Sequence, residues 1–312
     1  MTVSRPPANL LAPYALLGGA QVAVGAAAIF ARYALTGAGP LAVSASRLSI
    51  AAIVLLAIAA LSRHEASSVA SPAASRTGLR LAIAGLALAI HFGTWIASLQ
   101  YANVAVSTLL VATTPIWTAS YDALVRARPL SRRSAFAFVA GALGLVMVAG
   151  FNATAPPIPG RPWLGAALAI AGGMAMAAYL LLVRDVRSTT STRAIVTRTY
   201  GWAAIALIAT AAIAHQSPPR LTDAAAWGGI LGMALISQLL GHTALNAALR
   251  WFTPSAVGFS TLIEPVAAAV LAFFIFGEAL APVALAGGVV LLAATGVVLR
   301  DERADIQPES VI

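Results

Sequence analysis

Long apolar stretches recur along the whole chain, separated by short segments rich in proline, glycine and serine. A helix needs about 17–25 predominantly apolar residues to cross the hydrocarbon core of a bilayer. Ten stretches meet this length, at 14–34, 42–61, 79–99, 104–124, 134–150, 163–183, 195–214, 225–245, 255–275 and 282–299. The pattern predicts an all-α integral membrane fold with ten transmembrane helices.

The segments between these stretches are too short to form a domain outside the membrane. Several carry helix-breaking residues, as 36–40 and 156–160 do. The longest, 62–78, is rich in serine and alanine, and we expect it to be mobile. Residues 301–312 are polar and are expected to form a disordered tail in the cytoplasm.

Matching residues recur when the two halves of the chain are compared at an offset of about 150 residues. Ser46 and Arg47 correspond to Thr197 and Arg198 in this comparison. The pair 114–115 (Thr-Pro) corresponds in the same way to the pair 264–265 (Glu-Pro). The order of the matches and their nearly constant offset predict an internal repeat.

The predicted repeat contains five helices, with 1–155 as its first copy and 156–300 as its second. Because five is odd, the second copy must enter the membrane from the opposite side, which gives an inverted-topology repeat. Two halves with one fold and opposite orientation can open to either side with similar energies. Such a protein would alternate access to a substrate held between its halves, near the middle of the membrane.

Composition supports a membrane location and gives the orientation. Only 9% of residues are charged and 60% are apolar, with a mean hydropathy of +0.88, whereas soluble domains have roughly 25% charged residues. The net charge of +9 does not indicate nucleic acid, because the arginines flank the apolar stretches. With cytoplasmic termini, the inner segments hold 14 arginines and the outer loops hold 2. This bias predicts that both termini are cytoplasmic.

The absence of cysteine excludes disulfides and thiolate metal sites, and the four histidines are widely spaced. We predict neither a metal nor another cofactor. An ion channel would need a carbonyl filter or a ring of like charges, and neither is visible. A secondary transporter is favoured. The alternative from a different class is an intramembrane enzyme, although the sequence offers no convergent catalytic set.

Two acidic residues in or near the predicted helices are candidates for function. Glu264 lies in mid-helix before Pro265, where a charge is costly without a partner or a hydrated cavity. It could bind a proton or a substrate amine, or it could pair structurally with Arg47 or Arg198. Asp122 lies near a helix end, and an i,i+4 ion pair with Arg126 explains it without function.

Two helices carry polar stripes at helical spacing, and these helices are repeat counterparts. The stripes are His91, Trp95 and Ser98 in one helix, and Gln238, His242 and Asn246 in the other. They could line a cavity or form hydrogen bonds between helices, and we favour the cavity.

Six aromatic residues are expected to lie deep in the membrane, where they could stack on a flat substrate or pack against lipid or neighbours: Trp95, Trp117, Tyr179, Tyr200, Trp202 and Phe259. The predicted substrate site combines the stripes with these aromatic residues. Its members are His91, Trp95, Trp117, Tyr179, Gln238 and His242, with Glu264 as a charge partner.

The stretch 262–268 (LIEPVAA), the turn 276–280 (FGEAL) and the glycine-rich helix that includes 287–296 resemble the closing signature of EamA-type transporters, in the drug/metabolite transporter superfamily. The first half echoes it with Thr114 and Pro115 but lacks the Gly-Glu turn. The resemblance covers 11–299, and by it Glu278 is structural.

The resemblance implies a ten-helix carrier of the bacterial inner membrane that exports amino acids, other metabolites or drugs. The chain is most similar to the aromatic amino acid exporters. Its partners would be a small-molecule substrate and the lipid bilayer, with no nucleic acid. Proton coupling and uniport both stay open, as do a monomer and a homodimer.

Overall fold

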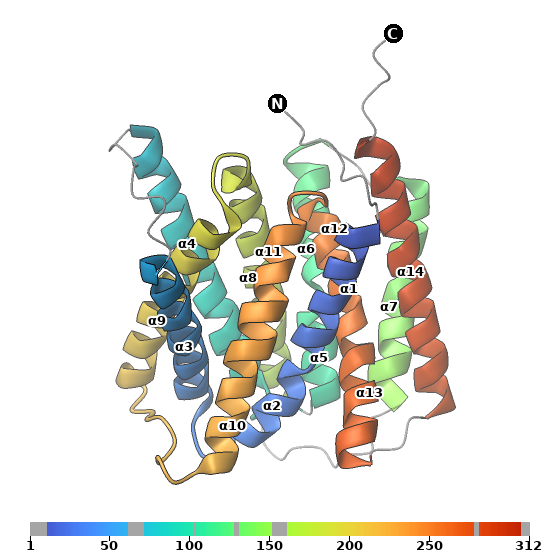
Figure 1. Ribbon diagram of the computed structural model, residues 1–312. Coiled ribbons are helices and arrows are strands. Elements are labelled where there is room, and N and C mark those ends of the chain that lie inside the picture. The colour runs from blue at the N-terminus through green and yellow to red at the C-terminus, as the bar shows by residue number, and fades with distance from the viewer. Residues whose placement is uncertain are drawn as a thin grey trace.

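The computed structural model describes residues 11–61, 72–102, 104–127, 131–151, 161–277 and 281–306, and in these ranges the chain is helical without a strand. The helices run roughly parallel or antiparallel in one bundle (Figure 1). In chain order they are α1 (Leu11–Gly25), α2 (Ala27–Ala34), α3 (Pro40–Leu61), α4 (Pro72–Ser98), α5 (Val104–Val111), α6 (Thr114–Leu124), α7 (Arg132–Phe151), α8 (Pro162–Arg187), α9 (Thr192–Ile213), α10 (Ala224–Gly232), η1 (Met233–His242), α11 (Thr243–Ala248), α12 (Pro254–Ser260), η2 (Thr261–Ile263), α13 (Glu264–Phe276) and α14 (Pro282–Ile306).

Eight segments of the described chain are long and apolar enough to cross a membrane. The two predicted spans outside this set are 104–124, which is divided into α5 and α6, and 134–150, which forms most of α7. The protein is therefore an all-helical membrane protein. The count of ten transmembrane helices stays a prediction.

Two predicted boundaries are wrong. Helix α4 begins at Pro72, inside the segment expected to be a mobile connection. Helix α14 continues to Ile306, through the first part of the predicted disordered tail. Helical hydrogen bonding extends beyond the apolar residues in both places, so hydropathy alone placed these ends too close to the membrane. The rest of the connection (62–71) and of the tail (307–312) lies outside the described residues, as do the 156–160 break and Glu278.

Two spans are interrupted just before a proline, at matching places in the two halves of the chain. Proline lacks an N–H and its ring collides with the carbonyl four residues earlier, so it ends or bends a helix. Before Pro265, the short 3₁₀ segment η2 intervenes, and the Glu264 N–H donates to the Thr261 carbonyl. Before Pro115, the break between α5 and α6 falls at residues 112–113. Both spans can therefore bend at mid-helix.

The span Ala224–Ala248 contains an unusual element, the ten-residue π-helix η1. A π-helix closes its hydrogen bonds from residue i to i+5, which shifts the faces of all residues that follow relative to an α-helix. Such segments are rare and occur frequently at functional sites. The residues of the predicted stripe, Gln238, His242 and Asn246, lie in this element or just after it and contact different neighbours, as described below.

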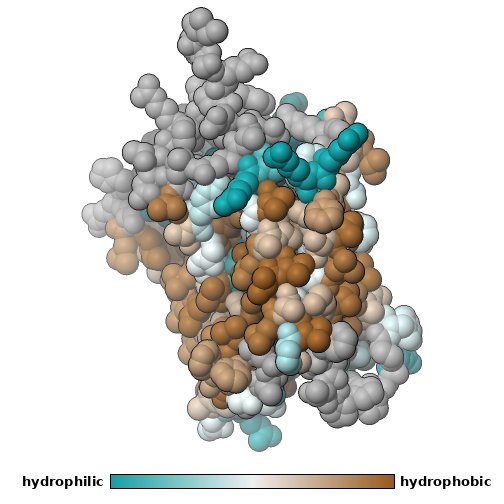
Figure 2. All heavy atoms as spheres, turned by 90° about the vertical axis from the view of Figure 1, so that its right-hand side faces the viewer, coloured by the Kyte–Doolittle hydropathy of each residue, from teal (hydrophilic) through white to brown (hydrophobic). Residues whose placement is uncertain are grey.

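Helix α7 packs closely against α14, so the last helices of the two halves lie together (Figure 1). A Cβ atom built on Gly287 would lie 2.7 Å from the Gly144 carbonyl oxygen, and one on Gly144 would lie 2.9 Å from the Gly287 oxygen. These two glycines permit a close backbone approach. The outer faces of the same helices form much of the apolar surface in Figure 2, where exposed side chains include Phe136, Leu143, Leu285 and Val289.

A polar network joins α6, α8 and α12 at the end of the bundle where α1 begins and α14 ends (Figure 1). Ion pairs join α6 and α8, and a hydrogen bond adds α12. Asp122 of α6 accepts from Arg184 of α8 at 3.3 Å and from the Ser255 hydroxyl of α12 at 2.8 Å. Arg126 pairs with Asp185 at 2.9 Å and with Asp122 at 3.8 Å. The predicted i,i+4 pair of Asp122 and Arg126 is thus confirmed. The network fastens this end across the two halves of the chain.

Candidate functional site

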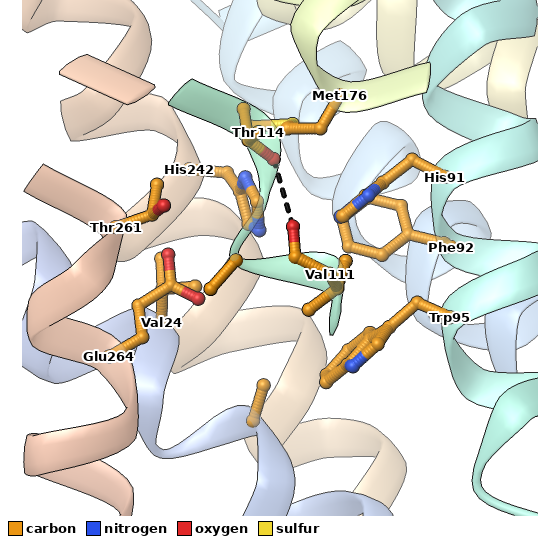
Figure 3. A pocket seen from close by; sticks show the side chains of 12 residues that line it. Val24, His91, Phe92, Trp95, Val111, Thr114, Met176, His242, Thr261 and Glu264 are labelled. Carbon is orange, nitrogen blue, oxygen red and sulfur yellow. Dashed lines mark hydrogen bonds between the residues drawn. The ribbon is translucent and has the colours of Figure 1, made fainter. Parts of the chain in front are cut away.

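A cavity lies within the bundle, between residues contributed by both halves of the chain (Figure 3). Its lining consists of Val24, Ala27, His91, Phe92, Trp95, Val111, Ala112, Thr114, Met176, His242, Thr261 and Glu264. The volume that the centres of water molecules can occupy is about 30 Å³. This is room for a few waters. The cavity is therefore too small, in this conformation, to hold an amino acid.

One wall of the cavity is aromatic. His91, Phe92 and Trp95 project from α4, and His242 approaches them from η1 (Figure 3). The His91 and Trp95 rings stack with centroids 6.3 Å apart and an interplanar angle of 9°. Phe92 meets His242 edge to face at 5.1 Å. Flat rings held in this way offer a stacking surface to a flat ligand.

The opposite wall carries the acid. Glu264 is half-buried and points into the cavity from the first turn of α13, with Thr261 one turn before it (Figure 3). Within the described residues it forms no ion pair, so the structural pairing with Arg47 or Arg198 is not observed, and Arg198 is exposed. A carboxylate at a helix N-terminus is favoured by the helix dipole. Glu264 is therefore available to a ligand.

Helix α8 holds the aromatic wall and the α5–α6 break in place through its backbone. His91 Nδ1 lies 3.0 Å from the Gly172 carbonyl oxygen. The Thr114 hydroxyl lies 3.0 Å from the Val111 oxygen and 3.3 Å from the Gly173 oxygen. A Cβ on Gly173 would lie 2.8 Å from the Val111 oxygen, so glycine is needed for this approach. The two glycines let α8 support the aromatic wall and the α5–α6 break at once.

Four of the seven predicted site residues share the cavity, namely His91, Trp95, His242 and Glu264. The other three lie elsewhere. Trp117 is half-buried on α6, where its Nε1 donates to the Thr113 hydroxyl at 3.3 Å. Tyr179 is buried and donates to Asn246 at 2.8 Å. Gln238 is buried against α3. Tyr179 and Gln238 thus join helices, whereas Trp117 bonds within its own span.

The predicted stripes are only partly cavity-lining. Ser98 lies outside the cavity, with its hydroxyl 2.6 Å from that of Ser107. Of the second stripe only His242 reaches the cavity, whereas Gln238 contacts Arg47 and Asn246 contacts Tyr179. Trp202 lies in the middle of α9 with 46% of it exposed, so it faces outward and does not line the cavity. Helical spacing alone could not distinguish the inner face from the outer face here.

Sequence reasoning missed the role of Phe92, and it gave Arg47 the wrong partner. Arg47 of α3 is fully buried, and its Nη2 donates to Gln238 Oε1 at 2.8 Å. Its guanidinium lies 4.1 Å from the centre of the Phe92 ring. The position of Phe92 beside His91 was the available signal, but an apolar residue in an apolar helix does not stand out.

The chain was then compared with known proteins. The model of the EamA-like transporter family matches twice, over residues 12–150 and 163–300. The chain belongs to the EamA-like transporter family. A crystal structure titled only as that of a protein has a TM-score of 0.74 and 15% identity, and the match covers 95% of this chain and 99% of the other. That likeness shows a shared fold. No curated protein matches the sequence closely enough to count as a relative.

As an EamA-like transporter, the protein is a membrane carrier built from two copies of the family unit. The cavity lies where the copies meet, since Val24 to Thr114 belong to the first match and Met176 to Glu264 to the second. Sites between repeats are typical of transporters with internal symmetry. Family membership thus gives the class of function, while the site and the substrate must be argued from the lining.

Proposed function

We propose that this EamA-like transporter exports amino acids, aromatic ones in particular, through the cavity between its two halves. The observation that carries the proposal is the lining itself. A stacked His91 and Trp95 face the unpaired carboxylate of Glu264 across a small space. An aromatic ring fits the first wall, and an ammonium group fits the second. Aromatic amino acids combine these two groups.

The small volume supports alternating access. A cavity with room for a few waters must expand before it can admit an amino acid. The breaks before Pro115 and Pro265 give two lining segments a mid-helix point at which to bend. We propose that the conformation described is a closed one, from which either end opens in turn.

The proposed inverted repeat also has structural support. In Figure 1, α1 and α8, the first helices of the two halves, run in opposite directions. Packing follows the exchange expected of a pseudo-twofold axis: α4 contacts α8, and its counterpart η1 contacts α1. We assign 1–155 and 156–300 to the two repeats.

We also propose that the end of the bundle with the Asp122 network faces the cytoplasm of a bacterial cell. The helix ends on this side of the bundle carry Arg126, Arg184 and Arg187. The arginine bias of the sequence favours the same orientation. Residues 301–312 would then be cytoplasmic. Nothing in the proposed cycle requires a second copy, so a monomer would suffice.

A second candidate function within the family is export of drugs or other metabolites. The apolar share of the lining, with Val24, Val111 and Met176, favours it as an alternative. An amphipathic drug would use the aromatic wall without needing an α-carboxylate. Transport of cationic dyes and of tryptophan by the same preparation separates the two candidates.

Replacing Trp95 by alanine is expected to lower the affinity for tryptophan and phenylalanine at least about 10-fold, because it removes the stacking surface beside His91. The measurement is counterflow of labelled amino acids into proteoliposomes that contain only this protein. Threonine, which has no ring to stack, should lose less affinity than tryptophan.

The matched control is Trp202→Ala, which removes a tryptophan exposed on the outside of α9. This variant should transport tryptophan as the wild type does. Equal losses in both tryptophan variants would indicate a general effect on the fold. Absence of amino acid counterflow in folded wild-type protein would refute the amino acid proposal.

A further inference from the structure

Arg47 is a buried charge without a carboxylate partner. It has no exposed surface, and within the described residues no acidic side chain lies within ion-pair distance of it. Its contacts are Gln238 Oε1, the Met233 sulfur at 3.8 Å and the face of Phe92. Burying an arginine among neutral partners costs several kcal/mol unless an anion offsets the charge. The structure supplies no such anion from its own side chains here.

Three of the buried polar atoms that lack a partner near Arg47 and the aromatic wall are N–H donors. Arg47 Nε and Gln238 Nε2 are buried without an acceptor, and so is Trp95 Nε1 in the aromatic wall. The assignment of the Gln238 amide follows from its neighbour, because only its oxygen can face the guanidinium. A carboxylate could satisfy these donors, because it carries a negative charge and only accepts hydrogen bonds.

The Phe92 ring lies between Arg47 and the cavity. Phe92 lines the cavity, and the guanidinium lies 4.1 Å from the centre of the same ring. His242, which also lines the cavity, contacts Phe92 from η1. Displacement of Phe92 as the cavity expands would bring Arg47 within reach of a ligand.

We propose that Arg47 binds the carboxylate of the substrate once Phe92 is displaced. This inference rests on the proposed amino acid export and adds a binding group outside the closed cavity. It makes the site complementary to a zwitterion, with Arg47 of the first half on the carboxylate and Glu264 of the second half on the ammonium group. Gln238 holds the guanidinium in place until the ligand arrives.

The test is equilibrium binding to the purified full chain of tryptophan and of tryptophanamide, which lacks the carboxylate charge. The wild type should prefer tryptophan, and Arg47→Gln should lose this preference by about 10- to 100-fold, the usual worth of a hydrogen bond to a charged group. Affinity for tryptophanamide should change little. An equal loss for both ligands would overturn the inference.

Arg198→Gln is the matched control, because Arg198 is the repeat counterpart of Arg47 and is exposed. It should leave the preference intact. If Arg47→Gln does not fold, Phe92→Ala decides the question. Removal of the Phe92 ring from Arg47 should raise the preference for tryptophan over its amide. An unchanged ratio of the two affinities would overturn the proposal.

Two further arms keep the conclusions separate. Repeating the measurements over a range of sodium chloride concentrations tests whether Arg47 serves an inorganic anion. If tryptophan binding and its preference over the amide require chloride, the inference would be wrong. If the folded wild type binds neither tryptophan nor its amide, the proposed function fails first, and the inference falls with it. Binding with no preference for the carboxylate rejects the inference alone.

Discussion

Glu264→Gln is expected to lower the affinity for tryptophan and for tryptamine by about 10- to 100-fold, because it removes the charge that faces the ligand ammonium group. Glu264 meets the cavity without an ion pair among the described residues, so its charge is not already committed to the protein. Counterflow and binding assays on the purified protein measure the effect. Indole-3-propionate, which has the ring and the carboxylate but no amine, should bind the variant as it binds the wild type.

Glu264→Asp is the control for this substitution, since it keeps the charge on a shorter side chain and should retain part of the affinity. An equal loss of affinity for indole-3-propionate in Glu264→Gln would show that the residue supports the fold instead of the ligand.

The proteoliposomes used for counterflow, with an imposed pH gradient, distinguish uniport from proton exchange. A gradient response that disappears in Glu264→Gln would identify the carboxylate as the proton site.

Gly287→Leu is expected to disrupt the crossing of α7 and α14. A Cβ at this position would already lie 2.6 Å from the Met147 Cβ and 2.7 Å from the Gly144 oxygen, and a larger side chain cannot be placed without separating the helices. Overpacking in a tight core typically costs about 1–3 kcal/mol, and contact with backbone raises the cost. The readout is thermal stability of the purified protein, followed by fluorescence-detected gel filtration.

The control lies on the same helix. A Cβ on Gly296 would meet nothing within 4 Å, so Gly296→Leu should keep the stability of the wild type. Both variants add the same apolar side chain to α14, and only the surroundings differ. Similar losses in the two variants would indicate that leucine is harmful anywhere on this helix, and that the close crossing does not account for the effect.

The sequence was sufficient for the helical architecture, because bilayer thickness imposes a long apolar stretch on each span. Pro115 and Pro265 mark the places where two spans are interrupted, because the effect of a proline on its helix is local, although 104–124 and 255–275 were predicted as continuous stretches. The ends of α4 and α14 were misplaced, because helices can extend beyond the bilayer into polar sequence. Hydropathy reports the solvent around a segment and does not report where its hydrogen bonding stops.

The candidate site was harder to predict, because side-chain direction depends on backbone geometry that hydropathy does not contain. Regular α-helical spacing put Gln238 and His242 on one face of a cavity lining, whereas in the structure Gln238 contacts Arg47 of α3 and only His242 lines the cavity. Nothing in the sequence of η1 indicates a π-helix. Glu264 was found because an acid in mid-membrane is rare and needs a reason.

The placement of Arg47 and Glu264 on opposite sides of one membrane-embedded region has an electrical consequence. Moving one elementary charge through the membrane potential is worth about 2.3 kcal/mol per 100 mV. With Glu264 ionised, its charge cancels that of Arg47, and a zwitterionic ligand adds none. Both the loaded and the empty protein would then change conformation without moving net charge, so export would not respond to voltage. A proton carried on Glu264 during the return step would remove this balance and make that step voltage-sensitive.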